Sequence, residues 1–234
     1  MIRQLIDRGN SLIAWTKKTR RVRLNGGVVK VNAGSSLSVT DGWINVDGSP
    51  HVLFAGWPSP VLKLLYKVSD ARNWCSEQQY YLDQLKSHAF VHHNLEYGLP
   101  FPDDSVDFVY SSHVLEHFYP HAAEHVLRDA YRVLKTGGRC RICVPDLQYA
   151  YQLYAQGRKG QALSYFFEPR SGEFNRHRYM YDFGLLAALL AKAGFRSIER
   201  CAYQQGLVPD LDRLDNRPEE TLYVECVKSP NLIG

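Results

Sequence analysis

The chain has 234 residues, of which 45% are hydrophobic and 22% are charged. This length suits one domain with insertions better than two full domains, and the composition is ordinary for a globular protein. No apolar run reaches the roughly 18 residues that a membrane-spanning helix needs, so we expect no integral membrane span. The first fifteen residues do not resemble a secretory signal, and the predicted location is cytoplasmic.

The net charge of +4 is unevenly distributed, because residues 1–30 hold eight Lys and Arg side chains and a single Asp. We predict a basic N-terminal arm or helix over residues 1–27. Its segment 17–23, KKTRRVR, could make a weak contact with an anionic surface, although such runs are more often solvated. We expect no nucleic-acid partner. If the protein is not an enzyme, the alternative hypothesis is a peripheral adaptor that binds through this arm.

The five cysteines are scattered and odd in number, which favours free thiols over a disulfide framework. Cys140 and Cys143 form a C-x-x-C in a segment that alternates like a strand. Positions three apart on a strand point to opposite faces, so this pair is not expected to bind metal or form a disulfide.

The apolar periodicity predicts strands and helices in alternation. Short strands are predicted at 28–34, 43–49, 88–95, 106–113 and 138–146. Residues 122–135 have helical spacing, and we expect Gly137-Gly138 to end that helix. A second helix, 181–195, is closed by Gly194 and followed by strands at 196–203 and 221–229. This order predicts a doubly wound α/β sheet over residues 28–230, with helical insertions at about 59–87 and 149–178.

The ends of the first two predicted strands carry residues suited to a ligand. Gly34 allows close backbone approach, and Ser35 and Ser36 offer donors for a carboxylate or phosphate, although a plain turn is an equal alternative. Only eight residues, 35–42, separate these strands, so the first crossover helix must be shortened or missing. Asp47 ends the second strand, where a Rossmann-type site places an acid that accepts hydrogen bonds from ribose hydroxyls.

Four histidines, at positions 113, 117, 121 and 125, are spaced four apart, and residues 113–117 match the H-x-x-E-H pattern of zinc hydrolases. A continuous helix would align these imidazoles on one face. Pro120 interrupts the helix, and His113 directly follows a predicted strand. We therefore expect no metal site.

Two blocks carry a family resemblance: NLEYGLPFPDDSVDFVYSSHVLEHF at 94–118 and YRVLKTGGRCRICVPD at 131–146. They resemble the class I S-adenosylmethionine-dependent methyltransferases of the small-molecule type. The segments RPEETLYVEC and HRYMYDFGLLAALLAKAGF also look like a predicted subfamily associated with surface-glycan clusters.

The resemblance implies a Rossmann-like, mostly parallel, seven-stranded sheet in the order 3-2-1-4-5-7-6 with a C-terminal antiparallel strand. It implies an enzyme that uses S-adenosyl-L-methionine, releases S-adenosyl-L-homocysteine and methylates a small-molecule or glycan acceptor. The alternative is a catalytically inactive cofactor-binding or scaffold protein of the same fold.

The resemblance also assigns roles to individual residues. It places the turn Asn32, Ala33, Gly34, Ser35 and Ser36 at the methionine portion of the cofactor, Asp47 at the ribose, Asn94 and Leu95 beside the adenine, and Ser111 and Ser112 under the sulfonium. Asn32 and Asn94 stand where many relatives have an acid. Asparagine keeps an acceptor oxygen but loses the charge, which motivates the inactive alternative.

His113, at the mouth of the fourth strand, is the candidate catalytic base, since imidazole titrates near neutral pH. Packing against the following helix is its alternative role. Residues that precede the late helix are the candidate acceptor-binding set: His177, Arg178, Tyr181 and Asp182. Asp182 could equally be the N-cap of that helix.

Overall fold

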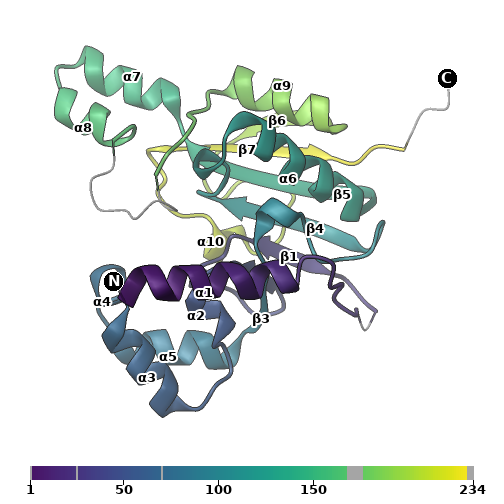
Figure 1. The fold of residues 1–234 in the computed structure, drawn as a ribbon. Helices are drawn as coiled ribbons and strands as arrows, with labels where there is room; N and C mark the ends of the chain where they lie inside the picture. Colours follow the sequence, from purple (N-terminus) through teal and green to yellow (C-terminus); the bar gives the residue numbers. More distant parts are fainter. Residues whose placement is uncertain (1, 25, 70, 168–175, 231–234) are drawn as a thin grey trace.

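The computed structural model describes residues 2–24, 26–69, 71–167 and 176–230. Within the first of these ranges, the backbone alone is described for residues 2–8. One sheet crosses the molecule (Figure 1). Its strands are β1 (Lys30–Ala33), β2 (Ile44–Asp47), β3 (Ala89–His92), β4 (Val106–Ser112), β5 (Leu134–Pro145), β6 (Arg196–Cys201) and β7 (Thr221–Val227).

The strand order is β3-β2-β1-β4-β5-β7-β6, which confirms the predicted fold class. The first five strands in this order are mutually parallel, and β7 is antiparallel to both β5 and β6. Residues 34–43, between β1 and β2, contain turns and no helix, so the missing first crossover helix is confirmed as well.

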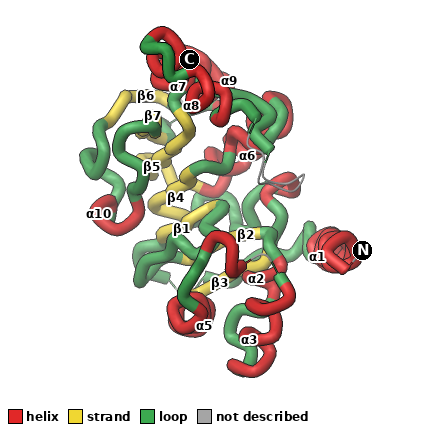
Figure 2. Tube along the Cα trace, turned by 90° about the vertical axis from the view of Figure 1, so that its left-hand side faces the viewer, coloured by secondary structure: helices red, strands yellow, loops and turns green. Residues whose placement is uncertain are grey.

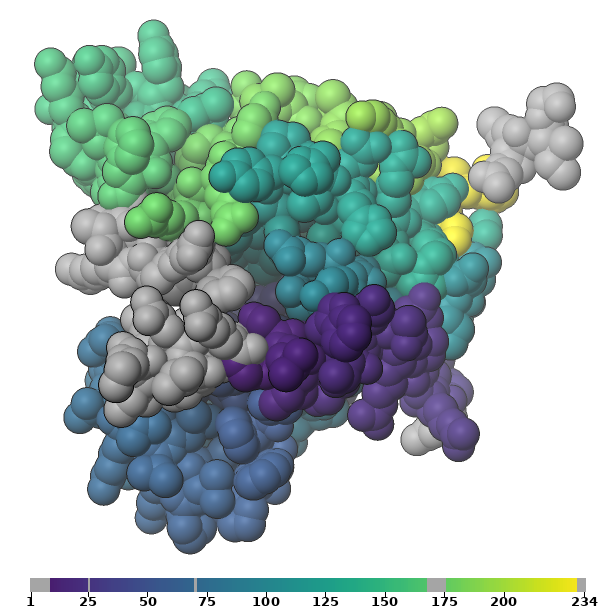
Figure 3. Space-filling view, in the orientation of Figure 1, coloured from purple at the N-terminus to yellow at the C-terminus, as the bar shows by residue number. Residues whose placement is uncertain are grey.

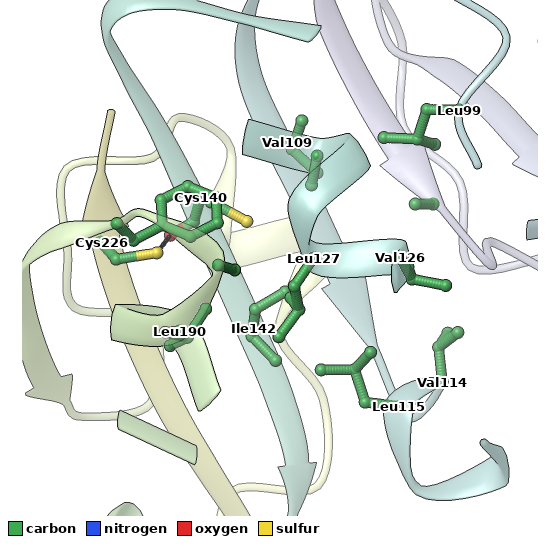
Figure 4. Close-up of a cluster of buried hydrophobic side chains, with 14 of the residues drawn as sticks. Leu99, Val109, Val114, Leu115, Val126, Leu127, Cys140, Ile142, Leu190 and Cys226 are labelled. Atoms are coloured by element: carbon green, nitrogen blue, oxygen red, sulfur yellow. Dashed lines mark hydrogen bonds between the residues drawn. The ribbon is translucent and has the colours of Figure 1, made fainter. Parts of the chain in front are cut away.

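The main core lies between one face of the sheet and two helices, α6 (Pro120–Val133) and α9 (Phe183–Ala193). Apolar residues at helical spacing on α6, such as Val126 and Leu127, pack with Leu190 of α9 against Ile142 of the sheet (Figure 4). In Figure 2 these helices and α1 stand to the right of the column of strands, whereas α10 (Leu211–Leu214) stands to its left.

The opposite face of the sheet carries a second cluster that includes Trp43, Tyr110 and Leu214. Cys143 belongs to this cluster, whereas Cys140 lies in the main core on the other face. The two thiols therefore point to opposite sides of β5, as their spacing predicts, and the five cysteines are all free.

Helices that follow β2 form a third cluster beside β3. They are α2 (Pro50–Leu53), α3 (Ser59–Val68), α4 (Ala71–Trp74) and α5 (Gln78–Ser87). Leu62, Ala71 and Tyr81 are its most buried members, and Leu37 and Phe90 connect it to the sheet. The region 59–87, expected to be a helical insertion, is thus helical.

Helix α1 (Ile2–Thr16) lies against the ends of β2 and β3. Asn10 Nδ2 donates to Gly48 O at 2.7 Å, and His92 Nε2 lies 2.9 Å from Asn10 Oδ1. Lys17 Nζ is 3.4 Å from His92 Nδ1. Helix α1 is therefore attached to the sheet through Asn10, and the basic segment 17–23 through its first residue, Lys17.

After β5 the chain continues into α7 (Leu147–Ala155) and α8 (Lys159–Ser164), within the predicted second insertion, of which residues 168–175 lie outside the described residues. Figure 3 shows α7 and α8 projecting at the upper left and α2 to α5 at the lower left. Both groups follow the carboxyl ends of parallel strands, so they flank the same edge of the sheet.

One local prediction is wrong: Gly137-Gly138 does not end α6. The helix ends at Val133, and Leu134 already pairs with Val106 as the first residue of β5. The register then shifts so that Phe108 pairs with Arg139, and Gly137, with φ +83°, lies in this irregularity. Glycine here permits a bulge in the strand.

Within the described ranges, none of the helices combines the length and apolarity that crossing a membrane requires.

Candidate functional site

The carboxyl ends of β1, β2, β3 and β4 meet at one edge because these strands are parallel neighbours. An open α/β sheet binds its ligands at this edge. The segments there are those that the sequence singled out: the turn after Ala33, Asp47, Asn94 and the end of β4 at Ser112.

The turn after β1 depends on Gly34. Its φ is +77°, and a Cβ at this position would stand 2.2 Å from Val114 Cγ2. Gly34 N donates to Val46 O at 2.7 Å, which holds the turn beside β2. The left-handed φ and the proximity of Val114 together exclude a side chain, so only glycine can form this turn.

Asp47 connects the turns that follow β1 and β2. Its Oδ2 accepts a hydrogen bond from Ser36 N at 2.9 Å, and its Oδ1 accepts one from Ser49 N at 2.7 Å. Each carboxylate oxygen has capacity for a further donor. Both turns are thus ordered around a negative charge that can also accept hydroxyl donors.

The two asparagines that depart from the family pattern have structural partners in this chain. Buried Asn32 donates from Nδ2 to Ser38 O at 2.7 Å and to Asn45 Oδ1 at 3.2 Å. A carboxylate at position 32 would face these two acceptor oxygens with no hydrogen to donate to them. Asn94 Oδ1 accepts from Glu96 N at 3.0 Å and caps the 3₁₀ helix η1 (Leu95–Tyr97), while buried Leu95 packs in the main core.

Ser111 and Ser112 end β4, and Ser111 is buried. The Oγ of Ser112 is also buried and has no hydrogen-bond partner in the part of the chain that the structure describes. A buried hydroxyl without a partner is uncommon and marks a place where a ligand or ordered water is expected.

His113 follows with a strained backbone, φ +54°. Its Nε2 lies 3.0 Å from Thr221 Oγ1 on β7, and its Nδ1 lies 3.3 Å from Glu116 Oε1 and 3.5 Å from Arg217 Nη1. Left-handed backbone at a non-glycine residue is typical of functional sites. His113 is therefore ordered by three different elements rather than by helix packing alone.

The four histidines do not form one helical stripe, since His113 follows β4, His117 lies on the 3₁₀ helix η2 (Leu115–His117) and only His121 and His125 lie on α6. Helix α6 begins at Pro120, so the predicted interruption is confirmed. Burial lowers the pKa of His117, and the carboxylate of Glu116 opposes this shift only in part, so the ring is neutral at pH 7.

The candidate acceptor residues lie on the segment before α9, and only part of the set converges. Arg178 N and Tyr179 N donate to Glu116 O at 2.7 and 3.2 Å, which attaches this segment to η2. Tyr181 is buried, and burial raises the pKa of its phenol. Asp182 Oδ1 accepts from Leu185 N at 2.8 Å, so the N-cap role is observed.

Glu116 is the residue of this region whose importance the sequence did not indicate. It is completely buried, and neither carboxylate oxygen has a hydrogen-bond partner among the described residues. Burial alone would raise the pKa of Glu116, but the imidazoles of His113 and His117 hold that pKa below its ordinary value. The feature of the sequence that could have identified Glu116 is its position between His113 and His117.

The fold and this edge define a Rossmann-like methyltransferase domain. Residues 65–142 match the family model described as a methyltransferase domain. This match and the observed strand order show that the chain contains a class I S-adenosylmethionine-dependent methyltransferase domain.

Solved structures share the fold at low sequence identity. An S-adenosylmethionine-dependent methyltransferase from Archaeoglobus fulgidus is 15% identical, with 97% of this chain and 94% of that chain covered and a TM-score of 0.50. The apo form of the S-adenosylmethionine-dependent methyltransferase SibL is 17% identical, with 98% and 57% covered and a TM-score of 0.51.

The residues at the strand ends fit S-adenosylmethionine, which supplies a methyl group activated by a sulfonium. The glycine turn offers backbone close to the ligand, Asp47 offers acceptors for hydroxyls, and Ser112 offers a buried hydroxyl without a partner. Gly48 lets the turn after β2 pack closely against the Asn94 segment, since a Cβ there would lie 3.3 Å from Asn94 Cα.

Proposed function

We propose that this chain binds S-adenosylmethionine through the turn 34–36, Asp47, the Asn94 segment and Ser112, and that it methylates a small-molecule or glycan acceptor. The observation that carries the binding site is the convergence of Gly34, Asp47 and the unpartnered Ser112 Oγ at one edge. In this site the chain's own part is to hold the acceptor in line with the methyl group, which accounts for much of the acceleration of such reactions.

Calorimetric titration with S-adenosylmethionine and S-adenosylhomocysteine tests the site. We expect saturable binding of both, weakened about 10-fold to 100-fold in Asp47→Ala, because a charged acceptor is lost. Asp41→Ala is the matched control, since Asp41 is an exposed acid on the loop that enters β2. Absence of binding, or equal affinity in Asp47→Ala and wild type, would contradict the proposed site.

His113 is our candidate for the acceptor base. The Glu116 carboxylate lies 3.3 Å from Nδ1 of His113 and can accept a hydrogen bond from it when Nδ1 carries the proton. The other ring nitrogen, Nε2, faces the Thr221 hydroxyl at 3.0 Å. A carboxylate that orients an imidazole in this way is a common arrangement in general base catalysis. A base is required only for acceptors that must lose a proton.

Exposed aromatic residues after β5 support a glycan or similar acceptor. A hollow between the first turns of α7 and α9 is lined by Leu147, Gln148, Tyr151, Asp182, Phe183 and Gly184. Tyr151 is 71% exposed, and Lys159 Nζ lies 5.5 Å from the ring centre of Tyr154. Aromatic faces together with a few polar groups are typical of small-molecule sites.

Transfer of labelled methyl groups to a panel of oligosaccharides, nucleotide sugars and small hydroxylated compounds tests the acceptor class. We expect incorporation into a sugar that falls in Tyr151→Ala and is unchanged in Trp57→Ala, an exposed aromatic before α3. Saturable cofactor binding without transfer to any member of the panel would favour the inactive cofactor-binding alternative instead.

A further inference from the structure

Glu116 presents an electrostatic problem that the methyltransferase site does not solve. Its carboxylate is fully buried and has no hydrogen-bond partner among the described residues. The nearest basic groups are two imidazole nitrogens, His113 Nδ1 at 3.3 Å and His117 Nε2 at 3.9 Å. An ionised buried carboxylate without strong partners costs several kcal/mol, so such groups are normally paired with a cation.

Two histidines direct nitrogen atoms toward this carboxylate. The rings of His117 and His177 have centroids 5.3 Å apart. The ligating atoms of Glu116, His117 and His177 all lie within 4.8 Å of one another. Atoms bound about 2.0–2.2 Å from a common centre lie at most about 4.4 Å apart, so small side-chain adjustments would bring these three atoms to metal-binding distance.

Backbone carbonyl groups orient both rings. His117 Nδ1 lies 3.2 Å from Arg176 O, and His177 Nδ1 lies 2.5 Å from Tyr165 O. When Nδ1 donates to a carbonyl, Nε2 keeps its lone pair for a ligand. Histidines that bind metals almost always donate their second nitrogen in this way.

The site is assembled by the fold rather than by one motif. Glu116 and His117 lie on η2, and His177 lies on the segment before α9. Arg178 N and Tyr179 N donate to Glu116 O, so backbone hydrogen bonds bring the two segments together independently of any ion. His113, which faces Glu116 Oε1, is placed to act as a second-layer donor to the carboxylate.

We propose that Glu116, His117 and His177 bind one divalent metal ion of the zinc class. Two imidazoles and one carboxylate form a donor set that suits zinc and leaves at least one coordination position for water or another ligand. This inference departs from the expectation of no metal site, which considered only ligands on a single helix. It goes beyond the proposed methyl transfer and does not depend on it.

The test uses the full chain, freed of metal by dialysis against a chelator and then titrated with Zn²⁺ against a chromophoric competitor. We expect one Zn²⁺ per chain, with affinity reduced about 100-fold or more in His177→Ala and in His117→Ala, because loss of a ligand exceeds the effect of losing a second-layer partner. Co²⁺ provides a second readout, since its visible absorption reports coordination geometry directly.

His125→Ala is the matched control, because His125 is exposed on α6 in the same histidine series. Glu116→Gln keeps the shape of the buried side chain, and its thermal unfolding curve shows whether the variant is folded. Folded Glu116→Gln should bind Zn²⁺ at least 10-fold more weakly than wild type. The proposal is overturned if the wild type does not bind stoichiometrically, or if His177→Ala binds like wild type.

Discussion

At the scale of single residues, Gly34 is the position where the cofactor edge has least room. The φ of +77° and the proximity of Val114 act together, since a Cβ would stand 2.2 Å from Val114 Cγ2. We expect Gly34→Ala to lower the free energy of unfolding by about 2–4 kcal/mol, through left-handed strain and overpacking combined. Urea unfolding of the purified variant measures this change.

Gly56→Ala separates the two causes. Gly56 has φ +78°, and no atom lies within 4 Å of its Cβ position. The Gly56→Ala variant should lose only the part of the unfolding free energy that comes from left-handed backbone strain, about 1–2 kcal/mol. Equal losses in the two variants would show that Val114 does not restrict the turn. Val114→Ala combined with Gly34→Ala should recover part of the difference.

Asp47 and Glu116 show what the sequence can and cannot predict about single residues. Asp47 is the last residue of the short strand β2, so its position at the ligand edge follows from a local pattern. Glu116 acquires its environment from His177, which lies beyond α6, β5, α7 and α8 in the chain. No local period connects them, and the H-x-x-E-H pattern suggested a helix that Pro120 prevents.

At the scale of elements, the attachment of α1 to the sheet depends on His92. This side chain bonds Asn10 and lies beside Lys17, with Asp47 and His93 also close enough to influence its charge. Burial, together with the positive charge of Lys17, lowers the pKa of His92 to about 4. The docked helix therefore requires a neutral imidazole.

This shift predicts acid sensitivity with a defined sign. Below pH 6.5 the unfolded chain protonates His92, whereas the folded chain does so only below about pH 4. The unfolded state thus binds more protons within this window, and stability falls as the pH falls through it. We expect His92 to account for a loss of about 2 kcal/mol by pH 4.5.

Urea unfolding at a series of pH values checks the contribution. His92→Asn should reduce the loss between pH 6.5 and 4.5, whereas His125→Asn, on the exposed face of α6, should leave the loss as in wild type. A His92→Asn variant with an unchanged pH profile would mean that His92 is protonated equally in the two states.

The elements themselves were largely predictable, because apolar periods and strand ends are local. The error at Gly137-Gly138 has a clear origin. Glycines after a helical run usually end a helix, but here Leu134 is already paired with Val106, and the glycines permit a bulge. Pairing with a neighbouring strand overrode the local signal.

At the scale of the whole molecule, the apolar interior is divided between a large core along the sheet and a smaller cluster among α2 to α5. The smaller cluster borders only the edge strand β3, whereas β4 and β5 are internal strands. We expect amides of α3 and α5 to exchange with solvent at a lower opening free energy than amides of β4 and β5.

Hydrogen exchange followed by mass spectrometry measures this difference for individual peptides. Under conditions where reclosing is faster than chemical exchange, so that exchange reports the opening free energy, peptides from 59–87 should exchange before peptides from 106–112 and 139–145. Simultaneous exchange of all these peptides would instead show one cooperative unit that includes the helices. Added S-adenosylmethionine should slow exchange near residues 34–47 most strongly if the proposed site is correct.

The complete sheet could not be derived from periodicity alone. Alternating strands and helices indicate a doubly wound α/β sheet, but the strand order 3-2-1-4-5-7-6 was implied by the family resemblance and is now observed. Long-range pairings such as β1 with β4 leave no trace in either segment's own pattern. The acceptor stays a proposal because its pocket depends on side chains from separate segments.

The docking of α1 also has a consequence for the order in which the protein acquires its structure during synthesis. Lys17 and its partner His92 are separated by 75 positions, so α1 is synthesised well before the strand that it contacts. At roughly 5–20 residues per second, the helix waits roughly 4–15 s for that partner. Throughout this interval Asn10 and Lys17 lack their partner His92, so α1 can dock only after β3 has been synthesised.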